Sequence, residues 1–187
     1  KPVETGCSLK NGKLFPWDAV ALLKASGADE TIDAINPYRL RHPLAPAVAA
    51  EIEGVTISRK KIISAYKKLS KKYDITIVEG AGGIMAPVYK RHLFLDLIKD
   101  LNLPIIIVAR PGLGTINHTL LTIEAAKSKG LDVAGVIINC AVKSRNGLAE
   151  NTNPAVIEQL AGVPILGIVQ YSAGSGSQIN NVFKRIA

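Results

Sequence analysis

The sequence predicts a doubly wound α/β fold, in which a mainly parallel sheet is covered by helices on both faces. Short runs such as residues 103–109 and 133–138 are apolar at almost every position, which is typical of strands buried on both faces. Segments with the spacing of amphipathic helices separate these runs. Helical connections between strands are what a parallel sheet requires, so the two patterns together favour this fold class.

The predicted elements alternate from residue 58 onward. Ser58 can cap a lysine-rich helix over residues 59–73, whose apolar side chains share one face. A helix beginning near Thr115 is expected to end before Gly130. The other helices are predicted at residues 18–25, 92–101, 154–161 and 178–186, and the strands at residues 75–78, 103–109, 133–138 and 164–169. Residues 36–50 contain three prolines and are expected to form a loop wall.

Length and composition favour one domain over residues 1–187. A chain of 187 residues with 48% hydrophobic content can bury one sizeable core. Its apolar runs are far shorter than the roughly 20 residues that cross a bilayer, so we expect a cytoplasmic protein without a membrane partner. Cys7 and Cys140 lie too far apart for a CxxC pattern, so reduced thiols are expected.

The net charge of +8 is concentrated in the predicted helix over residues 59–73. Its lysines fall opposite the apolar face, which is typical of a solvated outer helix. Nucleic-acid binding is the alternative, but the chain has few aromatic residues and no helix-turn-helix, zinc-finger or RNA-recognition signature. We therefore expect no nucleic-acid partner.

Polar and glycine-rich loops follow the predicted strands. They are residues 79–83, residues 110–115, Asn139 with Cys140, and Gln170 with Tyr171. The carboxyl ends of parallel strands gather at one edge of a sheet, where ligands of such folds bind. These loops are thus expected to form one binding edge.

Glu79 is the first candidate for metal binding, because its carboxylate is followed by glycines that let backbone N–H groups approach phosphate. Asp18 is the candidate second ligand, since Mg²⁺ beside a nucleotide usually takes one or two carboxylates. Each has a structural alternative. Glu79 can end a strand and cap a neighbouring helix, and Asp18 can be a helix N-cap.

The segment LGTINH, residues 113–118, favours an anion site. Gly114 and a capping Thr115 begin a helix whose unpaired N–H groups attract a carboxylate, although plain capping explains them equally well. His118 is expected to be a structural residue. The chain contains no GxxxxGK[ST] loop to wrap nucleotide phosphates.

Five motifs follow one another along the chain: KPVETG at residues 1–6, WDA around Asp18, VEGAGG at 78–83, LGTINHTLLTIEAAKSKGL at 113–131 and AGVIIN at 134–139. In order and spacing they resemble the dethiobiotin synthase family. VEGAGG alone is shared with amidotransferases and partitioning ATPases of the same class. Its combination with KPVETG and LGTINH is specific, and the resemblance covers essentially the whole chain.

The resemblance implies a phosphate-loop NTPase-like fold and an ATP-dependent ligase that requires Mg²⁺. Such an enzyme joins CO₂ to 7,8-diaminononanoate and closes a cyclic urea. An amine forms a carbamate, ATP phosphorylates the carbamate to a carbamic-phosphoric anhydride, and the second amine displaces phosphate. The chemistry is a phosphoryl transfer, so the protein supplies position and positive charge. The family also implies a homodimer, with the substrate site at the subunit interface.

The resemblance assigns roles by motif position. Lys1 matches the catalytic lysine, and Asp18 and Glu79 match the metal ligands. The substrate-binding positions are Thr5 and, from the second subunit, Gly114, Thr115, Ile116 and Asn117. The nucleotide-binding positions are Asp18, Glu79, Gly80, Ala81, Gly82, Asn139, Cys140, Gln170, Tyr171 and Ser172.

The chain departs from the family pattern in two respects. Members often carry Pro where this chain has Gln170, which affects the adenine contact. The first strand and the phosphate loop expected ahead of Lys1 are also absent, so we expect a fragment of a longer or split product, inactive by itself. The alternatives are another enzyme of this class, of the cobyrinate-amidating or partitioning type, and a non-catalytic paralogue.

Overall fold

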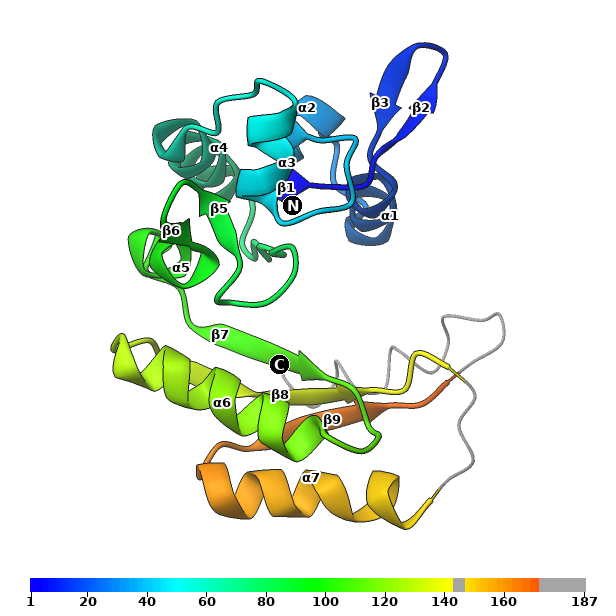
Figure 1. The fold of residues 1–187 in the computed structure, drawn as a ribbon, viewed down its shortest axis with the longest axis vertical. Coiled ribbons are helices and arrows are strands. Elements are labelled where there is room, and N and C mark those ends of the chain that lie inside the picture. Colours follow the sequence, from blue (N-terminus) through cyan, green and yellow to red (C-terminus); the bar gives the residue numbers. More distant parts are fainter. Residues whose placement is uncertain (143–146, 172–187) are drawn as a thin grey trace. The chain divides into compact units, whose positions relative to one another are not determined.

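The computed structural model describes residues 1–142 and 147–171 (Figure 1). Contacts between Cα atoms divide the chain into two compact units, Lys1–Asn102 and Leu103–Ala187, which are considered separately below. A single domain over the whole chain stays a prediction. Among the described residues, no helix combines the length and the apolar character needed to span a membrane.

The second unit contains the parallel sheet. In its described part the strands are β7 (Ile105–Ala109), β8 (Val133–Asn139) and β9 (Ile165–Val169), hydrogen-bonded in that order and all parallel. The connecting helices are α6 (Thr115–Ser128) and α7 (Leu148–Ala161), which contact each other and the sheet (Figure 1). This arrangement confirms the α/β class with parallel strands.

A continuous apolar core holds this unit together. Ile123 of α6, Ile138 of β8 and Ile157 of α7 are each at most 1% exposed and belong to one cluster. Burying a side chain of this size stabilises the folded state by about 1.5–3 kcal/mol. The core thus fixes the carboxyl ends of β7, β8 and β9, where the polar loops begin.

The first unit is assembled from short strands. β1 (Val3–Glu4) pairs in parallel with β4 (Tyr38–Arg39). β2 (Ser8–Lys10) and β3 (Lys13–Phe15) form a hairpin. Its turn residues, Asn11 and Gly12, have φ of 51° and 72°, as the tight Asn-Gly hairpin turn requires. A second hairpin joins β5 (Pro87–Tyr89) and β6 (His92–Leu93).

Helices surround these strands. They are α1 (Trp17–Ser26), α2 (Ile32–Ile35), α3 (Pro46–Ile52), α4 (Arg59–Lys72) and α5 (Phe94–Leu101). The Ser58 hydroxyl accepts a hydrogen bond from the Lys61 N–H, which confirms Ser58 as the cap of α4. Arg59 of α4 forms a bidentate ion pair with Asp100 of α5, and His92 Nε2 lies 3.0 Å from the same carboxylate.

Several predicted elements were wrong. Residues 75–78 form no strand in the described part of the chain, because no hydrogen-bonded neighbour lies beside them; Ile75 and Ile77 are 82% and 80% exposed. Residues 36–50 are not only a loop: they contain β4 and the start of α3, because proline is favoured at the first helical position, which Pro46 occupies.

The boundaries of two helices also differ. α7 begins at Leu148, and Pro154 lies inside it instead of near its start. α5 begins at Phe94, because His92 and Leu93 pair with β5. The helix predicted at residues 178–186 lies outside the described residues.

Candidate active site

Lys1 brings together residues that are distant in the sequence. Its Nζ lies 2.9 Å from Asp18 Oδ2 and 2.6 Å from Glu79 Oε1, and it donates a hydrogen bond of 2.9 Å to the Gly80 carbonyl. The Lys1 side chain is 5% exposed, whereas those of Asp18 and Glu79 are 55% and 47% exposed. The ammonium is therefore buried beneath two carboxylates that remain open to solvent.

The environment of Lys1 keeps its side chain charged. Burial by itself would lower the pKa of the Lys1 ammonium, but hydrogen bonds to Glu79 and Asp18 and their negative charges outweigh burial. The pKa is raised above its ordinary value of 10.5. Lys1 is thus a permanent positive charge at neutral pH.

Asp18 is placed by the first turn of α1. It is the second residue of the helix, so it is not the N-cap, and Pro16 holds that position. Its carboxylate is instead directed to Lys1. The structural alternative for Asp18 is therefore wrong.

Glu79 belongs to a loop that α5 holds in place. The Phe94 and Leu95 N–H groups donate to the carbonyls of Ala86 and Ile84, just beyond the glycines. A Cβ on Gly80 would lie 3.3 Å from the Phe94 ring, so glycine lets the loop approach α5 closely. The Gly80 carbonyl also receives the Lys1 hydrogen bond, and the ion pair of Glu79 is to Lys1.

The remaining predicted positions of the first unit flank these residues. Ala81 and Gly82 continue the Glu79 loop, and Gly82 has a φ of 80°, which favours glycine. Thr5 directly follows β1 and is half-buried.

The second unit presents its own predicted positions at one edge of its sheet. Asn139 ends β8 beside Val169, the last residue of β9, and the Cys140 N–H donates to the Val169 carbonyl at 2.9 Å. Gln170 and Tyr171 follow directly and are exposed. These four residues therefore lie at neighbouring strand ends. Ser172 lies outside the described residues.

Gly114, not Thr115, is the N-cap of α6. Gly114 has a φ of 83°, and Thr115 is the first helical residue, 1% exposed, with its hydroxyl 3.5 Å from that of Thr119. Ile116 is half-buried and Asn117 exposed. The Thr115 N–H donates to the Gly112 carbonyl at 3.2 Å, and no side chain caps the N–H groups that follow, which is a geometry that suits an anion.

Neighbouring side chains support this helix start. Asn153 of α7 is buried, and its amide donates to the carbonyls of Pro111 and Gly112 at 2.8 and 3.4 Å. His118 is exposed, with its Nδ1 3.0 Å from Arg110 Nη2.

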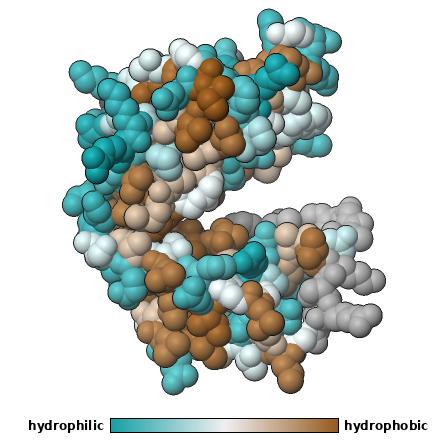
Figure 2. Space-filling view, viewed as in Figure 1, coloured by the Kyte–Doolittle hydropathy of each residue, from teal (hydrophilic) through white to brown (hydrophobic). Residues whose placement is uncertain are grey.

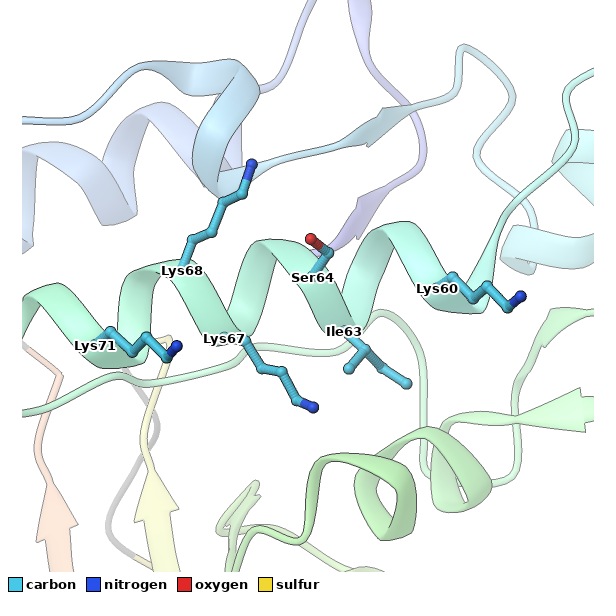
Figure 3. A pocket seen from close by; sticks show the side chains of 6 residues that line it. All are labelled: Lys60, Ile63, Ser64, Lys67, Lys68 and Lys71. Atoms are coloured by element: carbon cyan, nitrogen blue, oxygen red, sulfur yellow. The ribbon is translucent and has the colours of Figure 1, made fainter.

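A lysine-rich surface lies on α4. Figure 3 shows Lys60, Lys67, Lys68 and Lys71 lining a pocket with Ile63 and Ser64. All four lysines are exposed. This is the solvated helix face that the sequence favours, and the absence of a nucleic-acid partner stays a prediction.

The two carboxylates are suited to share a cation, because they already share the Lys1 ammonium. Within the described residues, no cluster of three or more His, Cys, Asp and Glu side chains could hold a metal ion. Mg²⁺ accepts few protein ligands when phosphate oxygens and water complete its octahedral shell. Asp18 and Glu79 therefore fit Mg²⁺ bound together with a nucleotide.

Comparisons with known proteins give the family. The sequence matches the AAA domain family over residues 1–178. A protein of Thermodesulfovibrio yellowstonii is 46% identical over 178 residues, which cover 91% of this chain and 74% of that protein. One from Bacillus subtilis strain 168 is 48% identical over 169 residues, covering 90% and 71%, and one from Methanocaldococcus jannaschii is 41% identical over 174 residues, covering 91% and 78%. Each is named ATP-dependent dethiobiotin synthetase BioD.

The chain belongs to the dethiobiotin synthetase family. Two buried residues beside Lys1 were not predicted from the sequence. Asn36 is 0% exposed, and its amide donates to the Lys1 carbonyl at 2.6 Å. Glu4 is 3% exposed and contacts the start of α1. The only sequence feature that pointed to Glu4 was an acid within a strand-forming motif, and no sequence feature pointed to Asn36.

Proposed function

We propose that this protein is an ATP- and Mg²⁺-dependent ligase that makes dethiobiotin from 7,8-diaminononanoate and CO₂. The observation that carries the proposal is the Lys1 ammonium, buried between the Asp18 and Glu79 carboxylates. Family membership supplies the reaction, and this geometry supplies the groups that the reaction needs. We also expect the enzyme to act in the cytoplasm.

Lys1 stabilises the anions that form along the reaction. One amine of the substrate attacks CO₂ and loses a proton, giving a carbamate. The carbamate attacks the γ-phosphorus of ATP and releases ADP, and the second amine then displaces phosphate as the urea ring closes. A fixed ammonium beside the carbamate and the transferring phosphoryl group lowers the energy of both, because their charge develops next to a pre-positioned positive charge.

Asp18 and Glu79 are the proposed Mg²⁺ ligands. When bound, the ion neutralises phosphate charge and orients the nucleotide. The half-exposed carboxylates leave room for phosphate oxygens and water, whereas the buried Lys1 supports them from beneath. Gly80, Ala81 and Gly82 would line the nucleotide through their backbone.

The strand ends of the second unit are the proposed nucleotide-base contacts. Asn139 would read adenine through its amide, and Cys140, Gln170, Tyr171 and Ser172 are the other proposed contacts. An amide offers both a donor and an acceptor, which the adenine edge requires. Thr5 would contact the diamine.

The start of α6 is the proposed site for the substrate carboxylate, contributed across a homodimer. Gly114, Thr115, Ile116 and Asn117 form this helix start, where the N–H groups and the helix dipole favour an anion. Apolar side chains reach the surface over α6 and α7 (Figure 2), and Leu113 and Leu121 are 85% and 60% exposed. Leu113 lies just ahead of the helix start and Leu121 lies in the middle of α6, and their exposure supports a subunit interface along this helix.

Turnover by the full gene product tests the proposal. Dethiobiotin is measured by mass spectrometry after incubation with 7,8-diaminononanoate, bicarbonate, ATP and Mg²⁺. Lys1→Ala and Glu79→Ala should abolish turnover. Lys24→Ala and Glu51→Ala, which change exposed residues of the same types, are the matched controls and should retain it. Near-normal rates in Lys1→Ala or Glu79→Ala would remove that residue from its role.

A further inference from the structure

Glu4 is a buried acid that the reaction described above does not use. It lies in β1 and is 3% exposed. Burying an ionised carboxylate is costly unless hydrogen bonds and positive charge compensate it. The groups around Glu4 therefore indicate why the residue is an acid.

Both carboxylate oxygens of Glu4 accept hydrogen bonds from the start of α1. Oε1 accepts from the Asp18 N–H and Oε2 from the Ala19 N–H, each at 2.9 Å. The N-cap residue of α1 is Pro16, whose side chain cannot accept a hydrogen bond. Glu4, which lies in strand β1, thus caps helix α1, and the positive end of the helix dipole compensates the charge of the Glu4 carboxylate.

This cap joins the two segments that carry Lys1 and Asp18. Lys1 lies just ahead of β1, and Asp18 is the second residue of α1. The Asp18 side chain is 55% exposed, so packing does little to fix it. Its backbone N–H, however, is held by Glu4, and its carboxylate reaches Lys1 Nζ at 2.9 Å.

We propose that Glu4 is a positioning residue, which fixes the first turn of α1 so that Asp18 and Glu79 face the same cation. The inference rests on the proposed function, because it takes Asp18 as a metal ligand. Ala19 is 0% exposed and also bound to Glu4, so the turn has little freedom to shift while the cap is intact. Loss of the cap should therefore weaken metal binding more than substrate binding.

Glu4→Gln tests this role in the full gene product. Glutamine keeps the size of the side chain but replaces one acceptor oxygen by an NH₂ group, which would face a backbone N–H. The Mg²⁺ concentration for half-maximal dethiobiotin formation should rise about 10-fold or more, as for other residues that orient metal ligands. KM for 7,8-diaminononanoate should change less than about 2-fold.

Amide hydrogen exchange gives a readout that does not depend on activity. Exchange at Asp18 and Ala19 should be faster in Glu4→Gln than in wild type, because their hydrogen-bond acceptors are changed. The matched control is Glu53→Gln. Glu53 accepts a hydrogen bond from the His42 N–H at 2.9 Å, and within the described residues none of its hydrogen bonds is to α1. The control should change neither exchange at Asp18 nor the Mg²⁺ requirement.

The outcomes separate the two proposals. An active wild type whose Mg²⁺ requirement is unchanged in Glu4→Gln overturns the role of Glu4 alone. A wild type that forms no dethiobiotin overturns the proposed function, and the positioning role falls with it. If Glu4→Gln does not fold, Glu4→Asp replaces it, since aspartate keeps the charge but is one methylene too short to reach both N–H groups. The same rise in Mg²⁺ requirement is expected, and its absence overturns the role.

Discussion

Gly135→Ala should destabilise the sheet of the second unit through a clash with one identified side chain. A Cβ on Gly135 would lie 2.7 and 2.8 Å from Leu166 Cδ1 and Cδ2, and closer still to Leu166 Cγ. Carbon atoms pack best at about 3.5–4.0 Å. The ladder between β8 and β9 pairs Val136 with Ile165 and Ile137 with Gly167, so Leu166 is the extra residue of a bulge beside Gly135.

The expected loss follows from which atom must move. Leu166 Cγ is one bond from Cβ, so a small rotation of the side-chain end does not remove the clash. Overpacking of this kind costs about 1–3 kcal/mol. The free energy of unfolding, measured by urea denaturation of the full gene product, should fall by that amount. Gly83→Ala, whose added Cβ meets no atom within 4 Å, is the matched control and should cost little.

A double-mutant cycle identifies the cause. In a Leu166→Ala background the clashing atoms are gone, so Gly135→Ala should cost less than about 0.5 kcal/mol. An equal loss in both backgrounds would refute the argument, because the cost would then come from the strand backbone and not from Leu166.

Three further predictions concern titratable and buried groups. The pKa of the Lys1 side chain is raised above 10.5 in the folded protein. The charged Lys1 side chain therefore contributes to stability below pH 10.5, and this contribution is lost as the pH rises through the higher folded pKa. The difference in unfolding free energy between wild type and Lys1→Ala should be constant from pH 7 to 9 and shrink above pH 10.5. A difference that disappears below pH 9 would contradict it. Burial, with the nearby charge of Glu4, raises the pKa of the Cys7 thiol to about 11. Only about one Cys7 in a thousand is then a thiolate at pH 8. Iodoacetamide should therefore label Cys7 far more slowly in the native than in the unfolded protein. Equal rates would count against this burial. Asn153→Ala leaves the Pro111 carbonyl without its 2.8 Å partner and should cost about 1–3 kcal/mol in urea denaturation, whereas the exposed Asn151→Ala should cost little. A loss equal to that of Asn151→Ala would show that the Asn153 amide does not hold the loop.

The sequence predicted the second unit well, because its elements are determined locally. Consecutive apolar residues at 105–109 and 133–138 are typical of sheet strands, and the helix between them has its own start and stop signals. The first unit was predicted less well. Its short strands β1 and β4 have two residues each, too few for a periodic pattern, and their pairing depends on contacts distant in the sequence.

Residues 75–78 illustrate the limit of periodicity. Their apolar pattern is that of a strand, but a strand also needs a neighbour to receive its hydrogen bonds, and the pattern does not supply one. Pro46 illustrates the limit of proline as a breaker, because the same residue that ends helices also begins them.

The residues of the candidate site were also predicted only in part. Asp18 and Glu79 could be chosen from their residue types, but their convergence on Lys1 was implied only by the family resemblance, since no spacing rule connects residues so far apart. Glu4 was not predicted, because a cap supplied by another strand leaves no local pattern at the helix it caps. The N-cap of α6 was assigned one residue late, because the glycine can adopt the left-handed φ that the chain needs there.

The most direct test of the central claim is the position of the metal ion. Crystals of the full gene product grown with ADP and Mn²⁺, in place of Mg²⁺, give an anomalous signal that locates the ion. We expect a single strong peak within coordination distance, about 2.0–2.6 Å, of carboxylate oxygens from both Asp18 and Glu79, with Lys1 Nζ beside the phosphates. An ion bound to the nucleotide with neither carboxylate near it would show that Asp18 and Glu79 are not the metal ligands.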